Sequence, residues 1–308
     1  MVPLLPCAHF CKRTDGMLRG SIVALVTPMH ASGDVDWQAL ERLIHWHLDQ
    51  GTHGIVPMGT TGESATLDTD EHLKVIRRTV EIVAGAVPVV AGTGSNSTSE
   101  AIHQTQQAAR DGADACLLVT PYYNKPTQEG LYQHYKAIAA ACEVPIVLYN
   151  VPPRTACDMK AETVGRLAQI PGIIGIKEAC GSPERIAQIR QLVDERFIML
   201  SGEDAQTLRM LELGAVGTIS VTANVLPRKM AEFCDAWAAG DHQRAADLDR
   251  YLQPMHEILF VETSPMPTKW ALYEMGMMDR GIRLPLVELS DQYKPELRAR
   301  LRAAGALQ

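Results

Sequence analysis

PIVLYN (145–150) and IIGIK (173–177) are the two stretches that decide the fold of this chain. Each is short, apolar on both alternating faces and bounded by Gly or Pro, which is typical of a strand buried on both faces in a parallel sheet. The stretch between them is long enough for the crossover helix that parallel neighbours require. A lone run of this kind could equally be a segment of a buried helix, so the interpretation depends on how often the pattern recurs.

The same pattern recurs along the chain, and amphipathic stretches separate its copies. Asp68 with Glu71 three residues later resembles a capping box, and Gly51 and Gly112 stand where helices would stop. Eight such units in roughly 220 residues indicate a (β/α)8 barrel. A doubly wound open sheet is the alternative, but it would require a Gly-rich fingerprint where the chain has TPMHASG (27–33). The six further runs are SIVALVTP (21–28), GIVPMG (54–59), VPVVAG (87–92), ACLLVTP (115–121), FIMLSG (197–202) and GTISVT (217–222).

Composition and patterning divide the 308 residues into three parts. Residues 1–16 lack periodicity and read as a leader, either disordered or preceding the true start at Met17. Residues 17–240 form the predicted barrel, and 241–308 form a small helical C-terminal appendage. The net charge of −7 gives no electrostatic footprint for nucleic acid, and no apolar run approaches the roughly 18 residues of a membrane span. Seven cysteines without framework-like spacing fit a reduced, cytoplasmic setting.

Catalytic groups of such a barrel lie at the carboxyl ends of its strands, and one lysine, Lys177, stands there. Burial favours the neutral amine, which is the form that attacks a carbonyl, so Lys177 is suited to Schiff-base chemistry. The alternative is an interior lysine paired with a carboxylate, for which Glu178 is one candidate. Tyr149 ends the neighbouring strand and could move protons to and from a carbinolamine, with Thr60 as a relay, or it could merely pack. The turn with Thr60 and Thr61 also offers backbone N–H groups to a small carboxylate.

Arg154 follows the same strand as Tyr149 on a loop stiffened by two prolines. An arginine there can clamp a carboxylate with two parallel hydrogen bonds, although a surface salt bridge is the alternative. No strand end carries histidine, and no carboxylate–histidine cluster suits a divalent ion. We therefore expect no metal and no phosphate-binding loop.

Seven co-linear motifs extend these single residues into a family resemblance from about Gly20 to the C-terminus. The chain resembles the pyruvate-dependent class I aldolases, the superfamily of N-acetylneuraminate lyase and dihydrodipicolinate synthase (4-hydroxy-tetrahydrodipicolinate synthase), and is most similar to the synthases. The lyases favour serine at the position of Thr60 and lack the NVPPRT segment around Arg154, so both features favour the synthase branch. The motifs are GSIVALVTPM, GTTGESATL, VVAGTGSNST, VTPYYNKPTQEGLYQH, LYNVPPRT, IIGIKEA and SVTANV.

This resemblance implies a condensation of pyruvate with (S)-aspartate semialdehyde, the entry to diaminopimelate and lysine synthesis, without a cofactor. Lys177 would form the imine, and Tyr149, Thr60 and Tyr123 would relay protons. Thr61 would help to hold the pyruvate carboxylate. The further roles are Arg154 on the semialdehyde carboxylate, Gly202 and Ile219 lining the pocket, and Tyr123 reaching into a neighbour's site across a tight dimer contact within a homotetramer, a dimer of dimers.

Two alternatives and one regulatory hypothesis accompany this assignment. The chain could be a related aldolase or lyase that acts on a sugar acid or a hydroxy-oxo acid, or a non-catalytic binding relative, which the intact Lys177, Tyr149 and Thr60 disfavour. Feedback inhibition by lysine is also implied by the resemblance, although Thr69 and Ser264 depart from the residues common in lysine-sensitive members. The positions that match the allosteric site are Ser64, Ala65, His72, Asn96, Glu100 and Tyr122.

Overall fold

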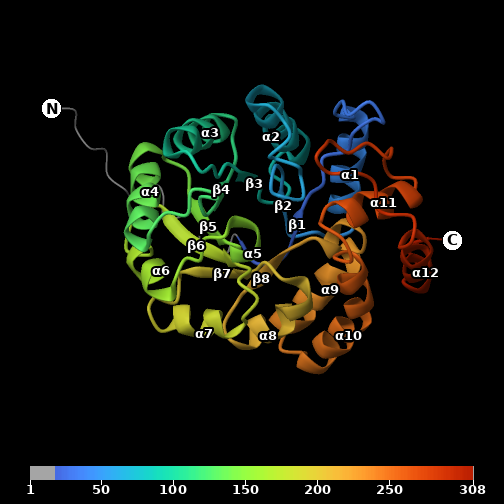
Figure 1. The fold of residues 1–308 in the computed structure, drawn as a ribbon. Coiled ribbons are helices and arrows are strands. Elements are labelled where there is room, and N and C mark those ends of the chain that lie inside the picture. The colour runs from blue at the N-terminus through green and yellow to red at the C-terminus, as the bar shows by residue number, and fades with distance from the viewer. Residues whose placement is uncertain (1–17, 308) are drawn as a thin grey trace.

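The computed structural model describes residues 18–307, and its centre is a sheet of eight parallel strands curled into a barrel (Figure 1). The hydrogen-bonded order is β2-β1-β8-β7-β6-β5-β4-β3. A parallel bridge between Ile55 and Val89 joins the two outermost strands and closes the ring. The strands are β1 (Gly20–Ala24), β2 (Gly54–Val56), β3 (Val90–Gly92), β4 (Ala115–Val119), β5 (Ile146–Asn150), β6 (Ile173–Glu178), β7 (Ile198–Ser201) and β8 (Gly217–Ser220). The (β/α)8 prediction is confirmed.

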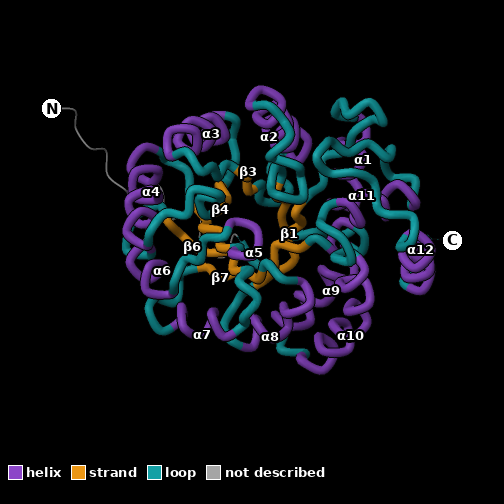
Figure 2. Tube along the Cα trace, in the orientation of Figure 1, coloured by secondary structure: helices purple, strands orange, loops and turns teal. Residues whose placement is uncertain are grey.

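Helices surround the strands as an outer ring (Figure 2). Asp68 caps the second helix by accepting the N–H of Glu71, and Gly51 and Gly112 take positive φ just after the first and third helices, as the sequence predicted. The ring consists of α1 (Trp37–Asp49), α2 (Thr69–Val83), α3 (Thr98–Arg110), α4 (Gln128–Ala141), α6 (Ala161–Leu167), α7 (Glu184–Arg190), α8 (Thr207–Glu212) and α9 (Pro227–Ala238). Shorter pieces are α5 (Pro152–Thr155), η2 (Asp204–Gln206) and η3 (Thr222–Asn224).

Three helices follow the barrel: α10 (His242–Ile258), α11 (Met266–Glu274) and α12 (Lys294–Ala303). They lie beside α9 and α1 at the right of Figure 1. No strand occurs after residue 240 within the described range, which agrees with the helical character expected for 241–308. The division of the chain at residue 240 stays a prediction, and the expected leader 1–16 lies outside the described residues. None of the helices within 18–307 combines the length and apolar character needed to cross a bilayer.

Side chains of each strand alternate between the barrel interior and the layer under the helices. Val147 and Tyr149 pack in the interior cluster, whereas Ile146 and Leu148 pack in the larger cluster against the helices. Both sets are buried, which explains why the strands read as continuous apolar runs. The alternation on β6 places Lys177 inward, beside its register partner Tyr149.

Candidate active site

The carboxyl ends of β5 and β6 bring Lys177 and Tyr149 together. The two residues are directly paired in the sheet, and the Nζ atom of Lys177 lies 4.3 Å from the centroid of the Tyr149 ring. Lys177 is only 6% exposed. Among the described residues no carboxylate lies within 4.0 Å of Nζ, so pairing with Glu178 is not what holds this lysine. A buried amine beside a phenol is the arrangement that imine chemistry needs.

Glu178 lies on the opposite face of β6, which rules out the alternative interpretation of Lys177. Its carboxylate accepts two hydrogen bonds from the Nδ2 of Asn150, at 3.0 and 3.2 Å. Burial raises the pKa of Glu178 to about 7. Lys177 therefore faces the cavity, and its neighbour Glu178 faces the helices.

A cavity of about 50 Å³ lies over Lys177 at the mouth of the barrel. A water molecule needs about 10–15 Å³ of such space, so the cavity suits a small organic acid. Seven sequence-predicted residues line it: Thr60, Thr61, Tyr149, Arg154, Lys177, Gly202 and Ile219. The structure thus gathers these residues from the ends of five strands, β2, β5, β6, β7 and β8, into one site.

Gly202 and the turn from Gly59 to Gly62 shape the cavity around Lys177. A Cβ atom on Gly202 would lie 2.8 Å from Cε of Lys177, so this glycine leaves the room that the lysine side chain occupies. Thr60 and Thr61 lie in a turn that Gly62 closes by donating its N–H to the carbonyl of Gly59, at 3.1 Å. The two threonines thus lie at the mouth of the cavity, and the carboxylate-binding role of their turn stays a prediction.

Arg154 lies at the outer rim, on α5. Its Nη2 donates to the carbonyl oxygen of Ser264 at 3.4 Å, and among the described residues it has no carboxylate partner within 4.0 Å. This exposed guanidinium at the mouth, which within residues 18–307 makes a hydrogen bond to a backbone carbonyl and no ion pair, remains available to an incoming anion.

The lining residues that were not assigned a role from the sequence include Glu203, Phe260 and Ser264. Glu203 follows the end of β7, so the strand-end rule could have found it. Burial raises the pKa of its carboxyl, whereas the charges of Lys177 and Arg154 act in the opposite direction. Phe260 and Ser264 come from the loop between α10 and α11, where no strand end marks them.

Tyr123 does not line the cavity of its own chain. It is 88% exposed and has a φ of 73°, on the loop after β4. The structure of one chain therefore presents this phenol outward instead of toward Lys177.

The six positions proposed for lysine lie near the ends of β2, β3 and β4. The Nε2 of His72 lies 2.8 Å from the carbonyl oxygen of Gly92 in β3. Asn96 donates to the carbonyl of Tyr122 at 3.1 Å, and Glu100 accepts from the hydroxyl of Ser95 at 2.8 Å. Ser64 is half-buried and Ala65 is exposed, just after the Thr60–Thr61 turn. Asn96 thus contacts Tyr122, Glu100 contacts the residue before Asn96, and His72 joins α2 to β3.

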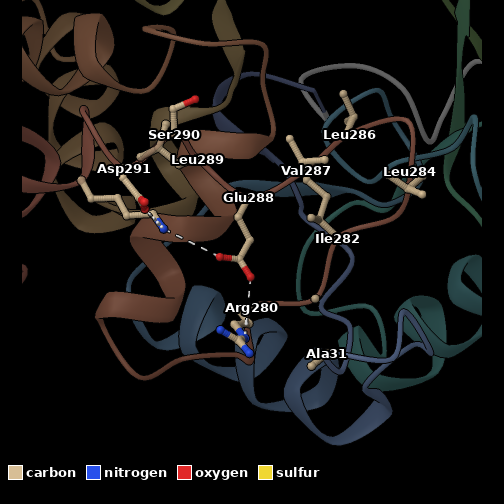
Figure 3. Close-up of a pocket in the computed structure, with 12 residues that line it drawn as sticks. Ala31, Arg280, Ile282, Leu284, Leu286, Val287, Glu288, Leu289, Ser290 and Asp291 are labelled. Atoms are coloured by element: carbon tan, nitrogen blue, oxygen red, sulfur yellow. Dashed lines mark ion pairs between the residues drawn. The ribbon is translucent and has the colours of Figure 1, made fainter.

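A wider hollow of about 550 Å³ lies far along the chain from these residues, on the loop before α12 (Figure 3). Its charged groups pair with one another: Glu288 lies 3.6 Å from Arg280 and 3.7 Å from Lys294. The rest of its lining is largely aliphatic, including Leu284 and Val287. Without convergent unpaired polar groups, this hollow offers no catalytic arrangement.

Comparison with known proteins gives a consistent picture. The 4-hydroxy-tetrahydrodipicolinate synthase of Alcanivorax borkumensis is 57% identical over 95% of this chain and 99% of the relative. The solved dihydrodipicolinate synthase of Acinetobacter baumannii, complexed with pyruvate, is 52% identical, with a TM-score of 0.92 over 94% of this chain and 99% of that structure. The lysine-bound enzyme of Cyanidioschyzon merolae is 39% identical, with a TM-score of 0.90 over 94% and 99% of the two chains. Residues 17–304 match the Dihydrodipicolinate synthetase family, and the chain belongs to this family of lyase-type synthases.

Proposed function

We propose that the chain condenses pyruvate with (S)-aspartate semialdehyde to 4-hydroxy-tetrahydrodipicolinate, in the diaminopimelate route to lysine. The observation that carries the proposal is the buried Lys177 beside Tyr149 at the floor of a small cavity. The pyruvate seen in the Acinetobacter baumannii relative and the names of the most similar relatives support the same substrates.

The reaction begins when the neutral amine of Lys177 attacks the ketone carbon of pyruvate. The carbinolamine loses its hydroxyl as water, and the proton that this departure requires comes from the phenol of Tyr149. Thr60 relays the proton onward, and Tyr123 of a neighbouring protomer completes the relay. The backbone and hydroxyl of Thr61 hold the pyruvate carboxylate.

The same proton relay removes a methyl proton from the imine, which gives an enamine. The enamine carbon attacks the aldehyde of the second substrate, and the aldehyde oxygen takes up a proton from the relay to become a hydroxyl. Arg154 binds the carboxylate of that substrate at the rim of the cavity, where its guanidinium lacks a carboxylate partner among the described residues. Gly202 and Ile219 leave the space in which the new bond forms. An arginine at this point favours an aldehyde that carries a carboxylate.

The test is pyruvate consumption with and without the semialdehyde, measured on wild type and Lys177→Ala. Lys160→Ala removes an exposed lysine and is the matched control. We expect semialdehyde-dependent consumption in wild type and the control, and none in Lys177→Ala. Wild type could instead fail to consume pyruvate in a semialdehyde-dependent way, while borohydride still traps pyruvate on Lys177. That result would support the Schiff base but contradict the semialdehyde as substrate, and sugar acids or hydroxy-oxo acids would be tested next.

The assembly is proposed to be a cytoplasmic homotetramer in which Tyr123 serves the neighbouring site. The outward position of Tyr123 supports this, because its own cavity does not include it. Mixing Tyr123→Phe with Lys177→Ala protomers tests the idea. Recovered activity indicates that Tyr123 of one protomer completes the Lys177 site of the other. If the mixture stays inactive after subunit exchange, the shared site is contradicted.

Lysine is proposed as a feedback inhibitor that binds near Ser64, Ala65, His72, Asn96, Glu100 and Tyr122. The lysine-bound relative from Cyanidioschyzon merolae supports the choice of lysine as the ligand. Glu100 offers an exposed carboxylate that could bind the ammonium of the inhibitor. Activity that stays unchanged up to millimolar lysine would contradict the proposal. If wild type is inhibited, Glu100→Gln is expected to need more lysine for the same inhibition.

A further inference from the structure

The turn that carries Thr60 and Thr61 is flanked by backbone in the left-handed region. Met58 has a φ of 57° and Glu63 has a φ of 58°, and neither is glycine. Such conformations persist where surrounding contacts determine them, and they gather at functional sites. The contacts that hold this turn therefore bear on the placement of the two threonines.

Glu63 makes two buried contacts at this turn, and its partners come from α11 and from the loop that follows α11. Its side chain is fully buried, and one carboxylate oxygen accepts a hydrogen bond from the ammonium of Lys269 on α11. The other oxygen accepts the backbone N–H of Arg283 at 3.1 Å. These partners lie 206 and 220 residues away along the chain.

Lys269 is buried as completely as its partner, with a side chain 3% exposed. Burial lowers the pKa of this lysine, and the adjacent Glu63 acts against that shift. Among the described residues Glu63 is the only carboxylate in contact with Lys269. A buried charge needs such a partner, so each member of the pair fixes the position of the other.

The chain beyond α11 extends this attachment along the segment after the turn. The guanidinium of Arg283 donates to the carbonyl of Thr66 at 3.0 Å and to both carboxylate oxygens of Glu71, at 2.7 and 2.8 Å. It also donates to the carbonyl of Gly33 at 2.8 Å. The C-terminal part thus holds the segment from Glu63 to Glu71 at three points.

We infer that Glu63 and Lys269 are positioning residues, through which the C-terminal helices place the Thr60–Thr61 turn against the pyruvate site. The inference rests on the proposed function, because it assigns these threonines to the proton relay and to the pyruvate carboxylate. Neither member of the pair lines the cavity, so neither touches substrate. The ion pair therefore acts by geometry, and through it α11 contributes to the placement of the turn.

A shortened side chain tests the inference without removing a charge. Glu63→Asp keeps the ion pair and the left-handed backbone, which aspartate tolerates, but pulls the turn toward Lys269 by about one methylene. We expect the KM for pyruvate to rise and kcat to fall, each at least about fivefold, because small displacements of positioned groups have large kinetic effects. The KM for the semialdehyde, which binds at Arg154, is expected to stay within about twofold.

A neutral double variant, Glu63→Gln with Lys269→Met, is the second test, since it removes the ion pair without leaving one buried charge. Its matched control is Glu274→Gln with Arg298→Met, which removes an ion pair of 2.7 Å from the same helix α11, away from the turn. We expect at least a tenfold loss in kcat/KM for pyruvate in the first double variant and less than twofold in the control.

All rates are expressed per active site, counted by borohydride trapping at saturating pyruvate, so that unfolded protein does not enter them. Wild-type pyruvate kinetics in Glu63→Asp, or equal losses in the two double variants, would overturn the inference alone. Failure of wild type to trap pyruvate would instead overturn the proposed function on which the role depends.

Discussion

Glu178 gives the chain a specific dependence of stability on pH. Its carboxyl group lies on the outer face of β6 and is fully buried, with two hydrogen bonds from Asn150. Burial raises its pKa from 4.5 to about 7, because the charged form loses its hydration. The guanidinium of Arg185 acts against this shift, but less strongly than burial.

The size and sign of the effect follow from the difference between the folded and unfolded pKa values. The change from 4.5 to about 7, at about 1.4 kcal/mol per pKa unit, corresponds to about 3 kcal/mol. The folded state binds the proton more tightly, so this stabilisation is fully present below pH 4.5. It falls as the pH rises from 4.5 and is gone above about 7.

Glu178→Gln provides the reference, because glutamine keeps an acceptor for Asn150 and never ionises. We expect the melting temperature of the variant, relative to wild type, to rise by about 6 °C between pH 4.5 and 8, taking about 2 °C per kcal/mol. Thermal unfolding followed by fluorescence at closely spaced pH values measures this difference. Glu162→Gln, at an exposed position of α6, is the control and should show a constant offset. A constant offset for Glu178→Gln as well would refute the assignment of a neutral buried carboxyl.

The cavity itself supports further predictions. Tyr149→Phe removes the proton donor and is expected to lower kcat by about 10²–10³ with little change in the KM for pyruvate; steady-state kinetics check this, and an unchanged kcat would contradict the relay. Arg154→Lys loses the two-pronged contact and should raise the KM for the semialdehyde about tenfold or more; an equal rise for pyruvate would argue against its assignment. Gly202→Ala sets a methyl group 2.8 Å from Cε of Lys177, so borohydride trapping of pyruvate should slow at least about tenfold, and unchanged trapping would mean that the lysine has room to move.

The periodicity of the sequence was enough to identify the architecture. Runs such as PIVLYN (145–150) must bury both faces, and eight of them separated by helical stretches close into one barrel. The same rule located Lys177 and Tyr149, because parallel strands present their carboxyl ends at one mouth. The strand-end rule also covers Glu203, but the sequence assigned this residue no role. A carboxylate after Gly202 cannot be distinguished from other loop residues until its neighbours are known.

Residues that reach the site from helices or loops could not be found in this way. Ser264 and Phe260 line the cavity from the loop between α10 and α11, and no local pattern predicts that this loop folds back over the mouth. The outward position of Tyr123 is equally invisible to spacing, because it depends on how one loop is turned after β4.

The sequence by itself determined the repeating strand–helix unit, the barrel that the units close, and the strand ends at which chemistry was expected. These depend on local preference and on the period of apolar residues, which each segment carries alone. Only the tertiary structure decided that Lys177 faces inward beside Tyr149 while Glu178 is buried outside, and that Lys269 meets Glu63 across 206 residues. The energies of buried charges depend on which groups surround them, and that neighbourhood exists only after distant segments have packed together.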